Sequence, residues 1–484
     1  MFSHSPLLQA IHNNASLYPD KYAVIVGENK VSYYQLYQNL LKAASLLESF
    51  GIKQGNCIVL SAHKDIEFIY LYLAAQAIGA INVIVDSESN LDRLSYIENA
   101  VQPTFCFGYK SSVFPSKLFQ DLDINIYPCY QELDDKKGLT SESISEILFT
   151  TGTTGKPKGV CLTYNNIFSA ASNINGFVQN TKDDIEVLGL PICHSFGMGR
   201  LRCNLIIGAT IVILGSFANV RAFFKAIEQY HATGFGVVPA AWAYIRKISG
   251  RRIEKFSDQI RYIEIGSASM PVSTKHELLE MFPKTRICMH YGLTEASRAC
   301  FMEFHDEEHL LSIGRPVCDK VDIRVFDDQG NMVPSGIKGE LCIKGNMVMK
   351  HYLNDDDNCN AFYGDYFRTG DCGFMDENGY LYLLGRDKEL INVGGKKVSP
   401  MEVEDAICSL GVGDCVCVAM KDEKGIMGEL VKCYVLKGST GLSFSDISRM
   451  LIGKLEAYKR PVEYEWIDEI PQTSSGKKQR ILLK

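Results

Sequence analysis

One short segment, residues 148–160, holds the densest set of groups that could bind an anion. It follows a mostly apolar run, residues 144–149, whose pattern predicts a strand. Its glycines allow sharp bends, so that successive backbone N–H groups can converge on one anion. Hydroxyl and ammonium groups add further donors, and the candidate phosphate-binding residues are Thr150, Thr151, Gly152, Thr153, Thr154, Gly155, Lys156 and Lys158. The segment therefore predicts a polyphosphate-binding loop at the end of a strand.

Pro157 restricts the type of phosphate loop. Proline has no backbone N–H and a fixed φ, so the chain cannot pass directly from this loop into a helix, as it does in a Walker loop. The spacing G-x-x-x-x-G-K-[ST] is also not met. The sequence thus disfavours a P-loop ATPase or kinase, and the competing interpretation of the segment is a polar surface loop.

Further polar or small residues follow other predicted strands. His194 lies in residues 190–197, and on its own it is more typical of a hydrogen-bonded loop histidine than of a catalytic one. Small residues at 266–268 would let a ligand approach the backbone closely. In residues 287–295, Tyr291 offers a flat aromatic face, Thr294 a hydroxyl, and Glu295 a hard oxygen ligand for Mg²⁺.

Taken in order, these segments resemble the motifs of the acyl-adenylate-forming superfamily. This superfamily includes acyl-CoA and aryl-CoA synthetases, the adenylation domains of peptide synthetases, and firefly luciferase. Residues 148–160 resemble its signature loop, and 291–295 resemble its Tyr-Gly-x-Thr-Glu motif. Three later segments are similar as well, namely Arg-Thr-Gly-Asp at 368–371, Gly-Arg-x-Lys at 385–388 and Pro-x-Thr-x-x-Gly-Lys at 471–477. The resemblance covers residues 22–484.

The resemblance implies a role for each motif. Lys477 would bridge the substrate carboxylate and the α-phosphate, Glu295 would hold Mg²⁺, and Lys388 would be the hinge of a mobile domain. The implied catalytic residues are Lys477, Thr151, Glu295 and His194, of which His194 would lie beside the substrate carboxylate. The residues implied to bind ATP, the acyl group or CoA are those of the phosphate loop together with Gly266, Ser267, Ala268, Tyr291, Gly292, Thr294, Asp371, Arg386, Gly394 and Gly395.

The implied activity uses ATP, Mg²⁺ and CoA. A carboxylic acid would attack the α-phosphorus of ATP to give an acyl adenylate and pyrophosphate, and the acyl group would then pass to the thiol of CoA. Two alternatives stay open: transfer to the phosphopantetheine of an acyl carrier protein, and a catalytically silent nucleotide-binding relative.

The charges near the predicted acyl site limit which carboxylic acids can be substrates. Residues 190–198 contain no carboxylate that could pair with a substrate ammonium group. A buried, unpaired ammonium is costly, so α-amino acids are expected to be poor substrates, and fatty, aryl or other non-amino acids are favoured. Arg298 could read a second acidic group on the substrate, although a salt bridge under the loop is the favoured interpretation.

The pattern of elements predicts an α/β protein. Helical and strand-like segments alternate from residue 22 to about 314, and from residue 321 short strands separated by turn residues predict a small antiparallel sheet or barrel. We expect a large N-terminal domain of α/β subdomains plus a small β-rich subdomain, residues 1–386, and a small mobile α+β lid domain, residues 387–484. The individual predictions are helices at 31–50, 67–78 and 400–410, strands at 57–61, 80–85, 235–240, 263–270, 414–420 and 430–436, and a helix capped by Ser443 and Asp446.

Composition excludes several classes of function. A net charge of −7 and a pI near 5.9 argue against nucleic acid or an anionic membrane as the main partner. Sixteen cysteines without a C-x-x-C pair are expected to be free thiols in a reducing cytoplasm. Residues 1–20 do not resemble a signal peptide, and the uncharged residues 68–85 are expected to form a buried helix and strand, not a membrane span. Residues 305–309 formally match an inverted zinc motif, but we expect a solvated turn without metal.

Overall fold

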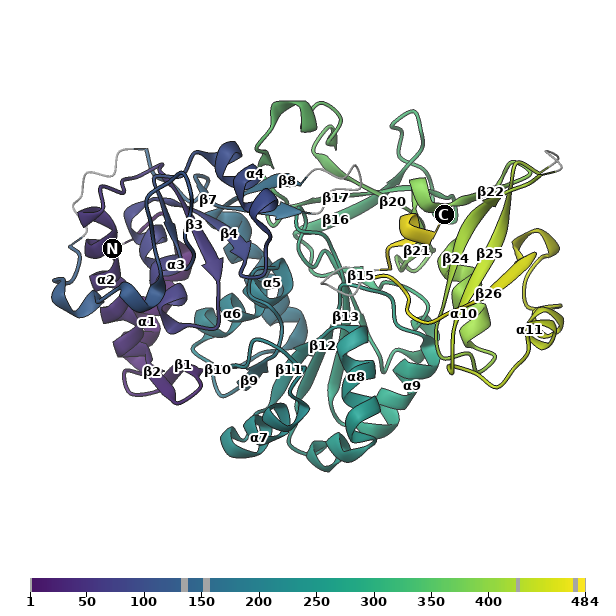
Figure 1. Ribbon diagram of the computed structural model, residues 1–484, viewed down its shortest axis with the longest axis horizontal. Helices are drawn as coiled ribbons and strands as arrows, with labels where there is room; N and C mark the ends of the chain where they lie inside the picture. The colour runs from purple at the N-terminus through teal and green to yellow at the C-terminus, as the bar shows by residue number, and fades with distance from the viewer. Residues whose placement is uncertain (1, 132–137, 151–156, 424–426, 473–477, 484) are drawn as a thin grey trace.

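The computed structural model describes residues 2–131, 138–150, 157–423, 427–472 and 478–483. Figure 1 shows two sheets with their helices in the N-terminal part, a strand-rich region in green at the upper centre, and a smaller C-terminal body to one side. The predicted fold class is confirmed.

The first large sheet is mixed, with a parallel centre. Within the described residues it has nine strands in the order β15-β14-β13-β12-β11-β9-β10-β1-β2, parallel from β13 to β1 and antiparallel at both edges. Its central strands are buried on both faces, as in sheets covered by helices on both sides. The strands are β1 (Tyr22–Val26), β2 (Asn29–Ser32), β9 (Ile185–Leu188), β10 (Thr210–Ile213), β11 (Gly234–Val237), β12 (Tyr262–Ile265), β13 (Arg286–Tyr291), β14 (Cys300–Glu303) and β15 (Arg315–Pro316).

The second large sheet has the same character. In the described part of the chain its order is β18-β8-β7-β4-β3-β5-β6, parallel from β7 to β6 and antiparallel at β8 and β18. The strands are β3 (Cys57–Ala62), β4 (Ile81–Asp86), β5 (Phe105–Phe107), β6 (Ser116–Lys117), β7 (Ile144–Thr150), β8 (Lys158–Thr163) and β18 (His351–Tyr352).

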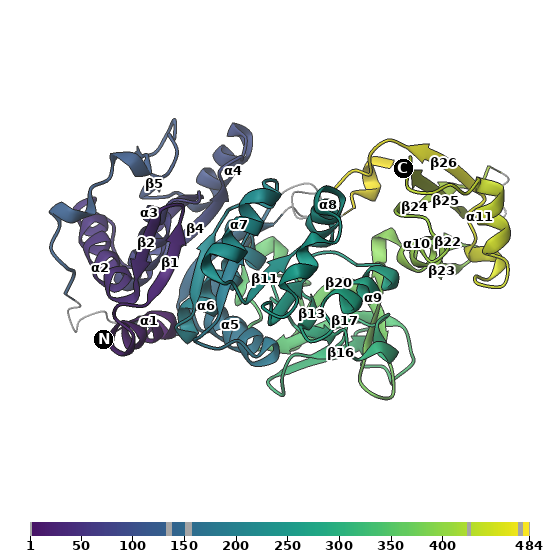
Figure 2. The same cartoon turned by 90° about the horizontal axis from the view of Figure 1, so that it is seen from below.

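A layer of helices fills the space between the two sheets (Figures 1 and 2). Helix α3 contacts β3 and β4, while α6 contacts β9 and β10, and α1, α2 and α5 pack between them. All residues of α3 except Glu67 are buried, which explains its uncharged sequence. The helices of the large part are α1 (Pro6–Leu17), α2 (Tyr33–Ser49), α3 (Ile66–Ile78), α4 (Leu91–Val101), α5 (Tyr164–Val178), α6 (Ser195–Ile207), α7 (Val220–Tyr230), α8 (Pro239–Ser249) and α9 (Val272–Met281).

The predicted β-rich region is confirmed. It is an antiparallel sheet of β16 (Val321–Phe326), β17 (Gly339–Gly345), β19 (Phe362–Tyr363), β20 (Tyr366–Met375) and β21 (Leu381–Arg386). The C-terminal body follows, with α10 (Pro400–Cys408), α11 (Phe444–Met450), the hairpin β22 (Ile391–Val393) and β23 (Lys396–Val398), and a sheet of β24 (Cys415–Lys421), β25 (Glu429–Leu436) and β26 (Glu463–Ile467).

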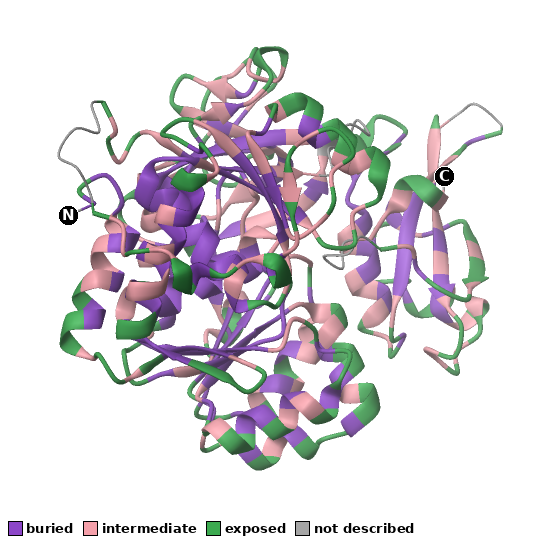
Figure 3. Cartoon of the chain, turned by 60° about the vertical axis from the view of Figure 1, so that its left-hand side comes forward, coloured by how far each residue is buried: buried purple, intermediate pink, exposed green. Residues whose placement is uncertain are grey.

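Separate hydrophobic cores stabilise these two bodies. In the large part, buried residues are concentrated in the sheets and in the helices between them (Figure 3), and the last buried residue of that core is Leu381. The core of the C-terminal body begins at Ile391. The proposed domain boundary after residue 386 falls in the interval between these cores, where the short helix η6 (Asp387–Glu389) carries the proposed hinge residue, Lys388.

Most predicted elements exist, with corrections at their ends. The helix predicted at 31–50 begins only at Tyr33, because Ser32 caps it and Val31 belongs to β2. The strand predicted at 235–240 ends at Val237, since Pro239 starts α8, and the strand predicted at 263–270 ends at Ile265, before the turn at Gly266. The capping box of Ser443 and Asp446 is confirmed.

Other expectations concern thiols, membranes and metals. All sixteen cysteines are free. In the described residues, no helix is both long and apolar enough to cross a membrane, and residues 68–85 form α3 and β4 as predicted. At 305–309, His305 contacts Glu303, while His309 contacts Asp306 and stacks on Tyr380 with ring centroids 3.5 Å apart.

Candidate functional site

The candidate site lies where the carboxyl ends of parallel strands from both sheets meet the β-rich region. Thr150 is the last residue of β7, and Lys158 is the first residue of β8. Parallel strands end at a common edge, where α/β sheets bind ligands. The other predicted phosphate-loop residues lie outside the described residues, namely Thr151, Gly152, Thr153, Thr154, Gly155 and Lys156.

The end of this loop is linked to Glu295 through an aromatic residue that the sequence did not reveal. Lys158 forms an ion pair with Asp357 at 2.9 Å, and its Nζ lies 4.8 Å from the ring centroid of Tyr352. The Tyr352 hydroxyl donates to Glu295 Oε1 at 2.8 Å. Burial and the nearby Glu295 carboxylate raise the pKa of Tyr352, which keeps it a donor. Lys158, at the end of the predicted phosphate loop, and Glu295, the predicted metal ligand, therefore both lie beside Tyr352.

Three predicted nucleotide-binding residues from three strands also converge. Asp371 and Arg386 are paired directly across β20 and β21, with Asp371 Oδ1 2.7 Å from Arg386 Nε. Tyr291, at the end of β13, donates its hydroxyl to Asp371 Oδ2 at 2.6 Å. Arg386 also donates to the carbonyl of Thr369 at 2.7 Å. A carboxylate has about four acceptor positions, so a carboxylate such as that of Asp371 is of a kind that can accept several hydrogen bonds at once, including bonds from sugar hydroxyls.

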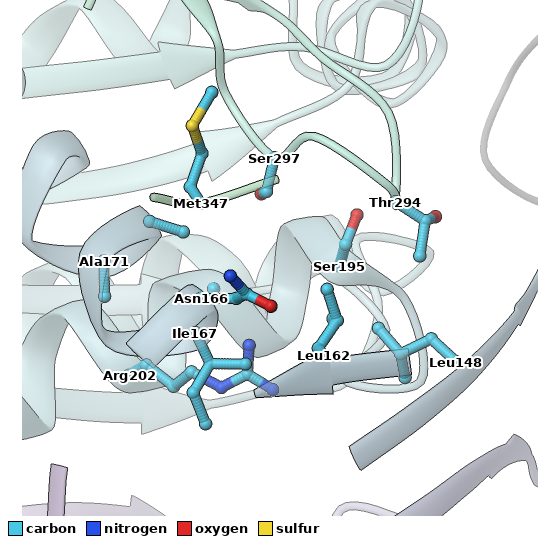
Figure 4. A pocket seen from close by; sticks show the side chains of 12 residues that line it. Leu148, Leu162, Asn166, Ile167, Ala171, Ser195, Arg202, Thr294, Ser297 and Met347 are labelled. Carbon is cyan, nitrogen blue, oxygen red and sulfur yellow. The ribbon is translucent and has the colours of Figure 1, made fainter. Parts of the chain in front are cut away.

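The turn after Tyr291 requires glycine. A Cβ on Gly292 would lie 2.4 Å from the backbone nitrogen of Arg298, because residues 292–298 fold back on themselves. Thr294 is partly exposed on this turn. Together with Ser297, Ser195 and Arg202 it lines a cavity of about 20 Å³, shown in Figure 4. Such a volume holds about one water molecule, so this cavity is too small to be an acyl pocket.

The small residues after β12 lie against a wall of large side chains. Ser267 has a φ of +74°, which is unusual for a residue with a side chain. A Cβ on Gly266 would lie 2.0 Å from the ring of His290, and Phe196 packs against the same ring in a T-shaped arrangement with ring centroids 4.6 Å apart. Ala268 is the third residue of this turn. Glycine is therefore required at 266 by the packing of His290, and the turn is backed by buried rings.

A buried ionic network beneath this wall was missed by sequence reasoning. Arg200 is fully buried and donates to Glu186 at 2.9 Å and to Glu264 at 2.9 Å. Arg298 Nε donates to Glu264 Oε1 at 3.1 Å, and its remaining donors reach the carbonyls of Ser195 and Phe196. The salt-bridge interpretation of Arg298 is thus confirmed. This network could have been predicted from the single carboxylate that interrupts each of the apolar strands β9 and β12, because a buried charge needs a partner.

His194 does not stand alone. It precedes α6 as its N-terminal cap residue, and the ligand atoms of His194, Cys193 and Asp86 all lie within 4.8 Å of one another. Asp86 ends β4 in the second sheet, so the histidine sits where both sheets meet. Neither Asp86 nor Cys193 was predicted to belong to a site.

The C-terminal body contributes two predicted features. Gly394 and Gly395, with φ values of +58° and +82°, form the tight turn between β22 and β23. Lys477 lies outside the described residues, but its flanks are fixed: Gln472 and Lys478 form an antiparallel bridge, and Lys478 forms ion pairs with Glu404 and Asp414. The described residues on either side of 473–477 are therefore paired with each other, and Lys478 is held to this body.

Comparison with known proteins agrees with this geometry. The family model of the AMP-binding enzymes matches residues 11–353, and the model of the AMP-binding enzyme C-terminal domain matches residues 402–477. The chain is 31% identical to the oxalate–CoA ligase of Arabidopsis thaliana over 97% of this chain and 96% of that protein. It is 27% identical to the 2-succinylbenzoate–CoA ligase of Bacillus licheniformis over 97% and 98%.

Solved structures show the same fold. The o-succinylbenzoate CoA synthetase of Bacillus subtilis, solved with its acyl-adenylate intermediate, has a TM-score of 0.86 at 24% identity, covering 98% of this chain and 97% of that chain. ATP-bound MatB from Rhodopseudomonas palustris has a TM-score of 0.88 at 23% identity, with 98% of both chains covered. The chain belongs to the AMP-binding enzyme family and is a member of the acyl-adenylate-forming superfamily.

Proposed function

We propose that this enzyme is an AMP-forming acid–thiol ligase. It activates a non-amino carboxylic acid with ATP, releases pyrophosphate, and transfers the acyl group from the adenylate to CoA. The observation that carries this proposal is the convergence of Tyr291, Asp371 and Arg386 beside the linked pair Tyr352 and Glu295. Full-length similarity to proteins named as CoA ligases supports CoA as the acceptor.

The chain's own residues would act mainly by positioning and by charge. Asp371 would accept from the ribose, Arg386 would hold Asp371 and contribute positive charge, and Lys158 would end the loop that receives the phosphates. The Glu295 carboxylate is a hard oxygen donor and fits Mg²⁺, which when bound supplies charge neutralisation at the phosphates. Lys477 would meet the substrate carboxylate and the α-phosphate as a compact point charge.

The packing around the Gly266 turn favours a compact acid. If the acyl group lies beside His194 and this turn, its extension is blocked on one side by His290, Phe196 and Arg298, all largely buried. His290 and Arg298 cannot withdraw cheaply, because both pair with Glu264. Of the matched relatives, one at 31% identity is named for oxalate, a compact acid, whereas one at 27% identity is named for the larger 2-succinylbenzoate.

The decisive experiment is ATP–pyrophosphate exchange driven by a panel of acids. We expect the strongest exchange with short non-amino acids, decreasing as the acyl chain lengthens, and at least about tenfold less with an α-amino acid than with its des-amino analogue, since an unpaired ammonium costs several kcal/mol. Thioester formation is then measured with CoA and, separately, with a phosphopantetheinylated carrier protein.

Each alternative has its own result. Stronger exchange with the amino acid than with its analogue would overturn the proposed acid class. ATP binding without exchange for any acid would indicate a catalytically silent relative. Thioester formation on the carrier protein alone would replace CoA as the acceptor.

A further inference from the structure

Asp86, Cys193 and His194 form a group of metal-binding donors at the junction of the two sheets. A carboxylate oxygen, a sulfur and an imidazole nitrogen from these residues all lie within 4.8 Å of one another. Asp86 comes from the end of β4, whereas Cys193 and His194 come from the turn between β9 and α6. Asp86 and His194 are partly exposed, while Cys193 is the most deeply buried of the three, so an ion could reach the group and still be partly shielded from water.

We propose that this group binds a borderline-soft divalent cation of the zinc class. Thiolate, imidazole and carboxylate are the donors that Zn²⁺ prefers, and three such ligands leave one position for water. One thiolate and one carboxylate balance the charge of the ion, so the bound site would be neutral. Mg²⁺ is not expected to bind, because it takes oxygen donors in octahedral geometry.

The spacing of the donor atoms can be compared with that of a tetrahedral shell. With metal–ligand bonds of about 2.0–2.3 Å, the ligand atoms of such a shell lie about 3.5 Å apart, so the three side chains need to close by roughly one ångström. Asp86 is already oriented by the backbone N–H of Glu88, which donates to its Oδ1 at 3.0 Å. Binding replaces the thiol proton of Cys193 by the metal ion, and the proton is released to solvent.

The consequence follows from the position of His194, and this step rests on the proposed function. A metal ion on His194 would occupy the place where the substrate carboxylate is expected, so zinc-class ions would inhibit adenylate formation while Mg²⁺ supports it. The site would therefore make the enzyme sensitive to free zinc. It also uses Cys193, a residue for which the proposed reaction has no role.

The binding test uses the full-length protein without nucleotide and Co²⁺ as a spectroscopic probe. We expect one equivalent of Co²⁺ to give the visible bands of a four-coordinate ion and a thiolate charge-transfer band. Cys193→Ser should abolish that band, and Asp86→Asn should weaken binding at least about tenfold. Cys359→Ser is the matched control, because Cys359 is an exposed free thiol, and it should change nothing. A band that persists in Cys193→Ser, or no band in the wild type, would overturn the site.

Two further measurements complete the test, and the first of them depends on neither variants nor activity. In the wild-type protein, Zn²⁺ should slow the alkylation of Cys193 at least about tenfold, as followed by peptide mass mapping, without slowing that of Cys359; equal rates would contradict the site. In the exchange assay, Zn²⁺ should inhibit the wild type and spare Cys193→Ser, and equal inhibition of both would reject the inhibitory role. If no acid drives exchange, the proposed function fails while the Co²⁺ spectrum still decides the metal site.

Discussion

At the scale of single residues, the candidate site is supported by charges that are paired underneath it. Arg200 and Arg298 carry two positive charges, and Glu186 and Glu264 carry two negative ones, all buried. Burial alone would raise the pKa of Glu264, but Arg298 and Arg200 outweigh it and hold that pKa well below its usual range. Burial lowers the pKa of His290, so its ring is neutral and the network is balanced.

Glu264→Gln should therefore destabilise the large domain by about 3 kcal/mol, because it leaves two buried guanidinium groups with only Glu186. The measurement is urea unfolding followed by the fluorescence of buried Trp242, in a background where Trp466 of the C-terminal body is replaced by Phe. Glu280→Gln is the control, since that side chain is 70% exposed, and it should change stability by less than about 0.5 kcal/mol. An unchanged unfolding midpoint in Glu264→Gln would show that the network does not hold the fold.

At the scale of elements, the C-terminal tail is fastened to α10 through one carboxylate. Glu404 is buried and accepts from Lys478 at 3.2 Å, from Arg480 at 2.9 Å and from the backbone N–H of Cys417 at 2.8 Å. Gln479 also donates from its backbone N–H to the carbonyl of Pro471 at 2.8 Å. The described residues that directly follow Lys477 in the sequence are thus held to α10.

Glu404→Gln should loosen this tail. We expect pyrophosphate exchange to fall about tenfold, equivalent to about 1.4 kcal/mol of lost positioning, while thioester formation from a supplied acyl adenylate falls less. Hydrogen exchange of residues 478–483 should rise in parallel. The control is Glu469→Gln, an exposed residue near the same loop. Equal loss of both half-reactions, with unchanged hydrogen exchange, would mean that the tail is not what positions Lys477.

The hydrophobic periodicity of the sequence was sufficient to predict most helices and strands, but it did not predict the contacts between them. Apolar runs gave β7, α3 and β4 correctly, because burial on both sides leaves a clear pattern. The start of α6 at Ser195 was missed, since two buried arginines and two glycines interrupt its apolar pattern. The motif residues of the site were identified from local sequence. The contacts of Asp86 with Cys193 and of Tyr352 with Glu295 were not, because they arise only from the way separate sheets and strands are brought together.

At the scale of the whole molecule, the two bodies meet through charged groups of unusual ionisation. Asp405 on α10 and Lys275 on α9 are close enough for each to shift the pKa of the other. Burial lowers the pKa of Lys275 to about 8, against the attraction of Asp405. Arg480 of the tail also donates to Glu389 of η6 at 3.0 Å, next to the proposed hinge residue. The arrangement of the bodies is therefore expected to respond to pH.

The ionisation of Asp405 determines whether stability rises or falls with pH. Burial and the adjacent Glu404 raise its pKa to about 6, partly offset by Lys275 and Lys478. The folded protein therefore binds this proton more tightly than the unfolded chain, whose aspartate has a pKa of about 3.9, so stability falls as the pH rises from about 4 to 6 and stays lower above 6. Asp405→Asn removes this penalty. Allowing for solvent screening, its gain over the wild type should be on the order of 1–2 kcal/mol above pH 6 and should vanish toward pH 4.

Thermal unfolding of both proteins between pH 5 and 7.5 checks this prediction, with the difference in Tm expected to shrink steadily as the pH falls through 6. Asp468→Asn is the control, because that carboxylate is 83% exposed on the same body and should give a small difference at every pH. A gain in Asp405→Asn that is independent of pH would mean that Asp405 is ionised normally and that the contact with α9 does not bury its charge. A gain that follows the titration instead, and that grows when Lys275→Met removes the opposing cation, would identify this pair as the electrostatic contact between the two bodies.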